Sequence, residues 1–182
     1  DYAWLAGLST ITGGAGADSL TGGAGDDELT GGADADTFVF ADSAANNGND
    51  TITDFNVGDG DKLDFLSFSD VNPIRSASGT PNYSIDPNEA FIVDYNGNIN
   101  GVDFGDAADF SLLFQPSTGA FFNTSGFIGT ATFVVQGDDE TQAYYVSDDD
   151  FNTDLTAANV TQVAILDGLT NGNLLTTDNF IT

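Results

Sequence analysis

The chain has 182 residues, of which 40% are hydrophobic, so it can fold around a core despite a formal net charge of −27. The excess of 29 acidic over two basic residues argues against nucleic acid and anionic membranes as partners. The sequence has no cysteine and no histidine, which excludes disulfides, thiolate zinc sites, thiol nucleophiles and imidazole acid–base chemistry.

Aspartate dominates the acidic residues, and the only glutamates are Glu28, Glu89 and Glu140. Aspartate is a poor helix former that favours turns, caps and metal sites. A salt-adapted surface would use glutamate freely, so this bias points to calcium. The sequence has no run of about 18 apolar residues that would span a membrane. Because it starts at Asp1 without a secretory leader, we expect it to be the tail of a longer or processed protein.

Three nine-residue units follow one another without a spacer over residues 13–39. They read GGAGADSLT, GGAGDDELT and GGADADTFV. Each has glycine in first place, an apolar residue in eighth place and aspartate in sixth place. The sixth-place aspartates are Asp18, Asp27 and Asp36. A single unit would be weak evidence for any site, whereas three contiguous copies in one register are specific.

The register continues on both sides of these units. Upstream, WLAGLSTIT (4–12) keeps it but carries Ser9 in place of the aspartate. Downstream, ANNGNDTIT (45–53) follows after an insertion of five residues. NVGDGDKLD (56–64) is a looser echo with Asp61 in sixth place.

The nine-residue period predicts half a coil per unit. Places seven to nine would form a short strand with the middle side chain facing inward. Places one to six would form a turn in which the glycines supply backbone angles that other residues resist. Two units would make one full turn of a flattened parallel coil, whose core is too thin to be stable alone. The turns therefore need another source of stability.

Stacked turns would bring two carboxylates and several carbonyls to one point, a set of oxygen ligands that suits Ca²⁺ better than Mg²⁺. We predict one site from Asp18 with Asp36, and a second from Asp27 with Asp50. Asp34 replaces a fourth-place glycine, and aspartate tolerates the left-handed conformation that the turn would need. The predicted metal ligands, backbone carbonyls included, are Gly13, Ala15, Asp18, Gly22, Ala24, Asp27, Gly31, Ala33, Asp36, Asp50, Asp54, Asp59 and Asp61.

These repeats resemble the RTX (repeats-in-toxin) family, whose nonapeptides build a calcium-bound parallel β-roll. The resemblance covers about residues 4–64. In that family a segment of the form D-x-I-x-D-F-x-x-G-x-D-x-I/L-D closes the β-roll, and here residues 49–65 read NDTITDFNVGDGDKLDF. The resemblance implies that the apolar residues of this segment cap the core. It also implies calcium-binding roles for Asp54, Asp59 and Asp61, and a solvated loop is the alternative for the first two.

We expect an all-β chain, with a calcium-bound parallel β-roll followed by a mainly antiparallel β-sheet or sandwich tail. Residues 1–65 would form the RTX β-roll with its capping segment. Residues 66–88 would form a loop-rich excursion, and residues 89–182 a C-terminal β region. In the last region EAFIVDYNGNINGVDF (89–104) reads as a hairpin with NGN at its tip, and GDDE (137–140) as a second hairpin turn.

The end of the chain also resembles exported proteins. AYYVSDDD followed by VAILDGLTNGNLLTTDNFIT is similar to the C-terminal regions of proteins that leave the cell by type I secretion. In that family the signal is uncleaved and lies in the last part of the chain. An ordinary terminal strand is the alternative, and the two are compatible because the signal is read before folding. The resemblance implies the type I secretion machinery as a partner and a secreted, extracellular or cell-surface location.

Two functions remain open at this point. The first is a non-catalytic, calcium-dependent folding and secretion module of an extracellular surface protein, such as an S-layer protein or an adhesin. The second is the C-terminal tail of a secreted enzyme of metalloprotease, lipase or alginate-modifying type, which would bind polysaccharide through calcium. Catalysis by a carboxylate pair within this chain is disfavoured, because no acid pair stands out from the others. Self-association and a cell-surface glycan are further partners to test.

Overall fold

A computed structural model describes residues 7–41, 43–66, 74–77, 83–84, 89–94, 122–123, 129–136, 141–148, 159–167, 169 and 175–181. Most of the regular structure in these residues is strand, which confirms the all-β class. The described helices α1 (Ala44–Asn47) and η4 (Thr177–Asn179) are single turns. In this part of the chain no helix has the length and apolar character needed to cross a membrane.

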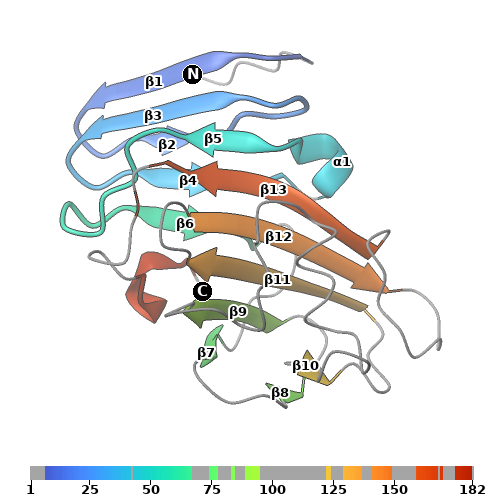
Figure 1. The fold of residues 1–182 in the computed structure, drawn as a ribbon. Helices are drawn as coiled ribbons and strands as arrows, with labels where there is room; N and C mark the ends of the chain where they lie inside the picture. The colour runs from blue at the N-terminus through green and yellow to red at the C-terminus, as the bar shows by residue number, and fades with distance from the viewer. Residues whose placement is uncertain are drawn as a thin grey trace.

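Residues 7–41 and 43–66, which we call the coil, wind between two sheets, and within each sheet the strands of the coil run parallel (Figure 1). The β1–β3 pairing aligns Thr10 with Glu28, and the β2–β4 pairing aligns Ser19 with Thr37. The partners lie two nine-residue units apart in the sequence, so two repeats make one full turn. One sheet contains β1 (Thr10–Ala15), β3 (Glu28–Ala33) and β5 (Asp50–Ile52), and the other contains β2 (Ser19–Leu20), β4 (Thr37–Val39) and β6 (Lys62–Asp64).

Eighth-place side chains lie between the two sheets and form the core of the coil. Phe40 and Phe65 lie outside the repeat register and widen this core with rings stacked 4.2 Å apart between centroids. Phe55, from the closing segment, packs against Phe38 with ring centroids 5.9 Å apart. The core therefore gains its bulk from aromatic residues next to the repeats. The buried eighth-place residues are Leu20, Leu29, Phe38, Ile52 and Leu63.

The C-terminal part of the chain continues both sheets of the coil. β13 (Val160–Leu166) pairs in parallel with β5, and Figure 1 shows it directly beside that strand. On the other sheet, Phe180 forms a parallel bridge to Leu63 in β6. Leu166, Leu175 and Phe180 join the same buried core as the repeats. Residues distant in sequence thus cover the last layer of the coil.

Beyond β13 the larger sheet is completed by the tail, in the order β1-β3-β5-β13-β12-β11-β9-β7. β11 (Gly129–Gln136) and β12 (Thr141–Asp148) pair antiparallel, with Gln136 opposite Thr141. The two strands therefore pair as the predicted hairpin requires, whereas its turn, residues 137–140, lies outside the described residues. β12 also pairs antiparallel with β13.

The far edge of this sheet differs from the expectation. β9 (Glu89–Asp94) runs parallel to both of its neighbours, β11 and β7 (Ile74–Ala77). Both edges of β9 are therefore occupied, and it does not form the expected hairpin through NGN; residues 95–104 themselves lie outside the described residues. The tail is thus a mixed sheet rather than a mainly antiparallel one, because the long connection between β9 and β11 permits a parallel crossover.

The expected division into three segments stays a prediction. The eight-stranded sheet runs across both expected boundaries. The 66–88 segment, expected to be loop-rich, supplies β7 and also β8 (Tyr83–Ser84), which forms a separate parallel pair with β10 (Phe122–Asn123).

Replacing Phe180 with alanine tests whether the C-terminal segment is part of the coil's core. Phe180 is 4% exposed and lies 6.2 Å from the Phe65 ring, between centroids. We expect Phe180→Ala to lower the free energy of unfolding by about 3 kcal/mol, measured by urea denaturation in saturating calcium. The control Leu8→Ala removes a side chain that is 83% exposed and should change stability by less than about 0.5 kcal/mol. Equal stability of the two variants would contradict this role of the segment.

Candidate metal centre

The first set of sixth-place aspartates stacks where the chain turns from the larger to the smaller sheet, at the left of Figure 1. The backbone N–H of Asp18 donates to Asp36 Oδ1 at 2.9 Å, and the N–H of Asp36 donates to Asp61 Oδ1 at 2.9 Å. Thr37 N–H donates back to the Asp18 carbonyl at 2.9 Å. Each carboxylate thus holds the backbone of the preceding layer. We call Asp18, Asp36 and Asp61 the first ladder.

The second ladder, Ser9, Asp27 and Asp50, lies at the turns on the other side of the coil. Ser9 N–H donates to Asp27 Oδ1 at 2.7 Å, and Asp27 N–H donates to Asp50 Oδ1 at 3.1 Å. The structure therefore stacks both predicted pairs, Asp18 with Asp36 and Asp27 with Asp50. The Ser9 layer, which has no carboxylate of its own, supplies only an N–H donor to this ladder.

The other carboxylate oxygen, Oδ2, is left without a partner in three of these residues. Oδ2 of Asp18, Asp27 and Asp36 is buried and accepts no hydrogen bond from the described residues. A buried charge without a partner costs several kcal/mol. The sequence has only Lys62 and Arg75 as basic residues, so the chain has little positive charge of its own to offer. The three oxygens therefore fit a cation from solution.

First-place glycines leave space beside these oxygens. A Cβ atom on Gly13 would lie 2.7 Å from Asp18 Oδ2 and 2.7 Å from the carbonyl oxygen of Gly31. A Cβ on Gly31 would in turn meet Asp36 Oδ2. The missing side chains therefore let these carboxylate and carbonyl oxygens lie close to the glycine backbone and to one another, as the ligands of one calcium ion must, since calcium–oxygen contacts are about 2.3–2.6 Å.

The same space occurs on the second ladder. A Cβ on Gly22 would lie 2.7 Å from Asp27 Oδ2 and 3.1 Å from Asp50 Oδ2. None of these first-place glycines has a positive φ. These glycines are required because a side chain would collide with a carboxylate. The sequence had instead suggested that all the glycines serve to provide unusual backbone angles.

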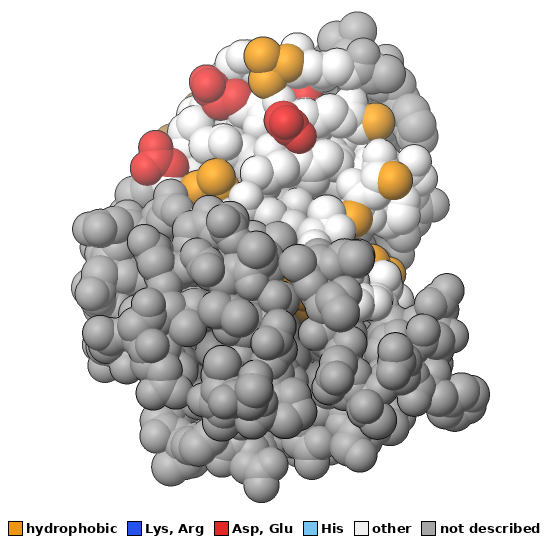
Figure 2. All heavy atoms as spheres, turned by 45° about the vertical axis from the view of Figure 1, so that its right-hand side comes forward, with side chains coloured by type: hydrophobic (Ala, Val, Ile, Leu, Met, Phe, Trp, Pro, Cys, Tyr) orange, Lys and Arg blue, Asp and Glu red, His pale blue; other side chains and the backbone are white. Residues whose placement is uncertain are grey.

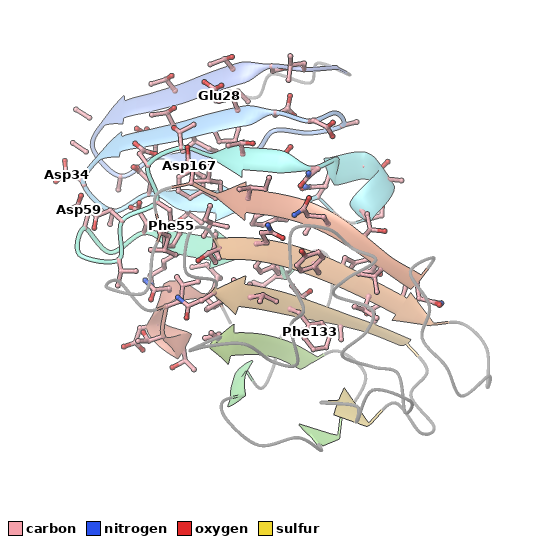
Figure 3. The ribbon with its side chains drawn as sticks, in the orientation of Figure 1. Glu28, Asp34, Phe55, Asp59, Phe133 and Asp167 are labelled. Atoms are coloured by element: carbon pink, nitrogen blue, oxygen red, sulfur yellow. The ribbon has the colours of Figure 1, made fainter. Side chains whose placement is uncertain are left out.

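Backbone angle does explain the second and fourth places of the unit. In the first unit Gly14 has φ 112° and Gly16 has φ 99°. Asp34, which replaces the fourth-place glycine of the third unit, has φ 76° and so adopts the left-handed conformation, as predicted. The turn therefore keeps its shape despite the substitution. Asp34 and Asp59 both lie at the turn end of the coil, at the left of Figure 3.

Protein donors close the two ladders at their C-terminal ends. Asn47 Nδ2 donates to Asp50 Oδ2 at 3.2 Å, and the Asn56 N–H donates to Asp61 Oδ2 at 2.8 Å. Burial raises the pKa of Asp50 to about 7, and burial likewise raises the pKa of Asp61. The last carboxylate of each ladder thus has an N–H donor at Oδ2, whereas Oδ2 of the preceding carboxylates has no donor among the described residues. The sequence did not predict a role for either asparagine. Only the position of Asn47, three residues before the sixth-place Asp50, could have indicated one.

The remaining predicted acidic ligands lie in different surroundings. Both oxygens of Asp54 accept backbone hydrogen bonds, from Gly31 N at 2.8 Å and from Gly32 N at 2.9 Å. Asp59 is exposed and accepts from Asn56 Nδ2 at 2.7 Å. These contacts anchor turns, and metal-binding roles for Asp54 and Asp59 stay predictions.

Backbone carbonyls have to complete any calcium site in this coil. Among the described residues no three acidic side chains gather in a group that could hold a metal ion. The carbonyl of Gly31 borders the space at Gly13, whereas those of Ala24 and Ala33 accept hydrogen bonds from Gly7 and Gly16 at 2.9 and 3.2 Å. Roles for the predicted carbonyls of Gly13, Ala15, Gly22, Ala24 and Ala33 stay predictions.

The surface of the coil adds to the demand for cations. Figure 2 shows acidic side chains projecting from its described face, with no Lys or Arg side chain visible beside them on that face. Cations that bind the coil would therefore also reduce repulsion within a chain of net charge −27.

Comparison with known proteins agrees with this geometry. Residues 6–38 match the family model for the RTX calcium-binding nonapeptide repeat, in four copies. No curated protein and no solved structure matches the chain. The matched segment contains all three aspartates whose Oδ2 atom is buried without a partner. Residues 6–38 are therefore RTX nonapeptide repeats, a motif that binds calcium ions.

Proposed function

We propose that this chain is a non-catalytic module that folds when it binds calcium, and that it serves an extracellular surface protein exported by type I secretion. The observation that carries the proposal is the row of buried Oδ2 atoms on Asp18, Asp27 and Asp36, each beside a glycine that leaves room for an ion. The RTX repeats support the export route, since proteins with such repeats generally leave the cell by type I secretion.

The geometry supports a proposal of three calcium positions. The first lies beside Gly13, where Asp18 Oδ2 and the Gly31 carbonyl would be ligands. The second lies beside Gly22, where Asp27 Oδ2 would be the ligand and Asp50, whose Oδ2 already accepts from Asn47, lies next to it. The third, beside Gly31, would use Asp36 Oδ2. In each case the carboxylate would bind the ion through Oδ2 while an Oδ1 atom holds the neighbouring layer.

Binding and folding would be one process. Without calcium, the burial of several carboxylates in a thin core opposes folding, and the glycine-rich turns lose much chain entropy when they become ordered. Extracellular calcium modules have Kd values of roughly 10⁻⁴–10⁻³ M, so the chain would stay unfolded in a calcium-poor cytosol and fold outside. Folding outside the cell would also oppose backward movement through the export channel.

The biological setting has two candidates. A surface-layer or adhesive protein is the favoured candidate, because the chain has no cysteine or histidine for catalysis. Its conspicuous polar clusters are the first and second ladders. A secreted enzyme with its catalytic domain elsewhere is the alternative, and this module would then bind acidic polysaccharide through calcium. Calcium-dependent self-assembly of the purified chain would favour the first candidate, and calcium-dependent retention on an acidic polysaccharide column would favour the second.

The replacement Asp36→Asn tests the assignment of Oδ2 as a calcium ligand. Asparagine keeps an oxygen that can accept the Asp18 N–H but loses the charge and the second oxygen. We expect the calcium concentration at the midpoint of folding, followed by far-UV circular dichroism, to rise about tenfold or more. Asp178→Asn removes the same charge from an exposed residue of η4 and should leave the midpoint nearly unchanged. Equal midpoints for the two variants would show that Asp36 is not a ligand.

Acid should partly replace calcium. The folded-state pKa of Asp50 is about 7 and its ordinary value is 3.8, so the folded chain holds a proton that the unfolded chain releases. This contribution to stability is complete below about pH 4 and is lost as the pH rises through 7. In EDTA we therefore expect a larger folded fraction, measured by far-UV circular dichroism, at pH 5 than at pH 8.

Asp50→Asn should reduce this dependence on pH because residue 50 can no longer titrate. Asp167→Asn removes one charge from an exposed position and should leave the dependence as it is. If Asp50→Asn shows the same fall in folded fraction between pH 5 and pH 8 in EDTA as Asp167→Asn, the dependence has another origin.

A further inference from the structure

Asp54 directly follows the unit at residues 45–53, at the position where an unbroken nine-residue register would have a first-place glycine. The backbone pairing between β3 and β5 ends at Leu29 and Ile52, just before Asp54. The Asp54 carboxylate then takes over, accepting from Gly31 N at 2.8 Å and from Gly32 N at 2.9 Å. Its two oxygens accept the hydrogen bonds that the backbone carbonyls of a longer neighbouring strand would otherwise accept.

One of these hydrogen bonds acts on the calcium position beside Gly13. The N–H of Gly32 and the C=O of Gly31 belong to the same peptide unit, which is planar and points its two polar groups in opposite directions. When Asp54 Oδ2 holds the Gly32 N–H, it also fixes the direction of the Gly31 carbonyl. That carbonyl oxygen borders the space at Gly13, opposite Asp18 Oδ2.

The negative charge of Asp54, like its hydrogen bond, favours cation binding by the Gly31 carbonyl. A hydrogen bond to a charged acceptor polarises the donor group, and linked hydrogen-bonding groups strengthen one another. A carboxylate on the N–H side of the peptide therefore makes the Gly31 carbonyl oxygen a better ligand for a cation. We propose that Asp54 is a positioning residue for the calcium ion beside Gly13, acting through the Gly31–Gly32 peptide without contacting the ion; this inference rests on the proposed calcium function.

The contacts of Asp54 differ from those of the proposed ligands. Asp18, Asp27 and Asp36 each have a buried Oδ2 without a partner, whereas both Asp54 oxygens are engaged by amides. Outer partners that orient metal ligands commonly contribute 10- to 100-fold in metal affinity, so the effect of Asp54 should be measurable.

The test is a site-resolved calcium titration by ¹H–¹⁵N NMR of the full chain, comparing wild type, Asp54→Asn and Asp178→Asn. Asparagine at 54 loses the charge and one of the two acceptor oxygens. Asp178→Asn removes the same charge from an exposed residue of η4, which is not a proposed ligand. The amides of Asp18 and Gly32 report the ion beside Gly13, and the amide of Asp27 reports the ion on the second ladder.

For Asp54→Asn we expect the Kd reported by Asp18 and Gly32 to rise about tenfold, while the Kd at Asp27 stays within twofold of wild type. Asp178→Asn should match wild type at all three amides. Three results would overturn the inference: complete loss of the ion beside Gly13, which would make Asp54 a ligand; equal weakening at both ladders, which would indicate general destabilisation; or no difference from Asp178→Asn. If wild type itself shows no saturable response to calcium, the proposed function fails independently of Asp54.

A measurement on unaltered protein covers the case in which Asp54→Asn does not fold. In calcium-saturated wild type, the hydrogen bonds should give scalar couplings between the amide nitrogens of Gly31 and Gly32 and the carboxylate carbon of Asp54. The absence of these couplings, with backbone ladder couplings visible in the same spectrum, would also overturn the inference.

Discussion

The structure depends on burying aspartate carboxylates at the turns of a thin coil. Each carboxylate after the first layer accepts, at Oδ1, a hydrogen bond from a backbone N–H of the preceding layer, and this hydrogen bond sets the distance and register between layers. In the regular repeats the second oxygen accepts no hydrogen bond from the described residues. One residue type thus holds neighbouring layers together and makes them depend on a cation.

At the ends of the two ladders, protein groups take the place of a cation beside the carboxylates. Asn47 and Asn56 supply N–H donors to the last Oδ2 atoms, so the final layer is satisfied by protein groups. Asn47 also donates to the Val163 carbonyl in β13 at 3.0 Å. On the other sheet, Asn179 Nδ2 donates to the Asp61 carbonyl at 3.1 Å. The calcium-binding repeats and the C-terminal segment therefore meet through buried asparagines, and the open end of the coil is covered instead of exposed as an edge.

The repeats could be predicted from the sequence because a fixed period determines which residues stack. The pairs Asp18 with Asp36 and Asp27 with Asp50, the buried eighth-place residues and the turn at Asp34 all follow from counting in nines. The role of the first-place glycines did not follow, because the steric conflict with a carboxylate becomes visible only in three dimensions. The partners of Asp54 were hidden for a similar reason, since the insertion before residue 45 shifts the stacking distance from 18 to 23 residues. In the tail, the pairing of β13 with β5 and the parallel course of β9 depend on contacts between distant segments, which no local pattern specifies.

The most direct test of the account is a calcium titration of the wild-type chain after removal of metal by EDTA, followed by far-UV circular dichroism, with Mg²⁺ as the control ion. The account predicts a cooperative gain of β-structure with Ca²⁺ in the range of roughly 10⁻⁴–10⁻³ M and little gain with Mg²⁺, which demands a stricter octahedral site. A chain that is already fully folded in EDTA at neutral pH, with a spectrum unchanged by Ca²⁺, would contradict the claim that buried carboxylates make the fold depend on calcium.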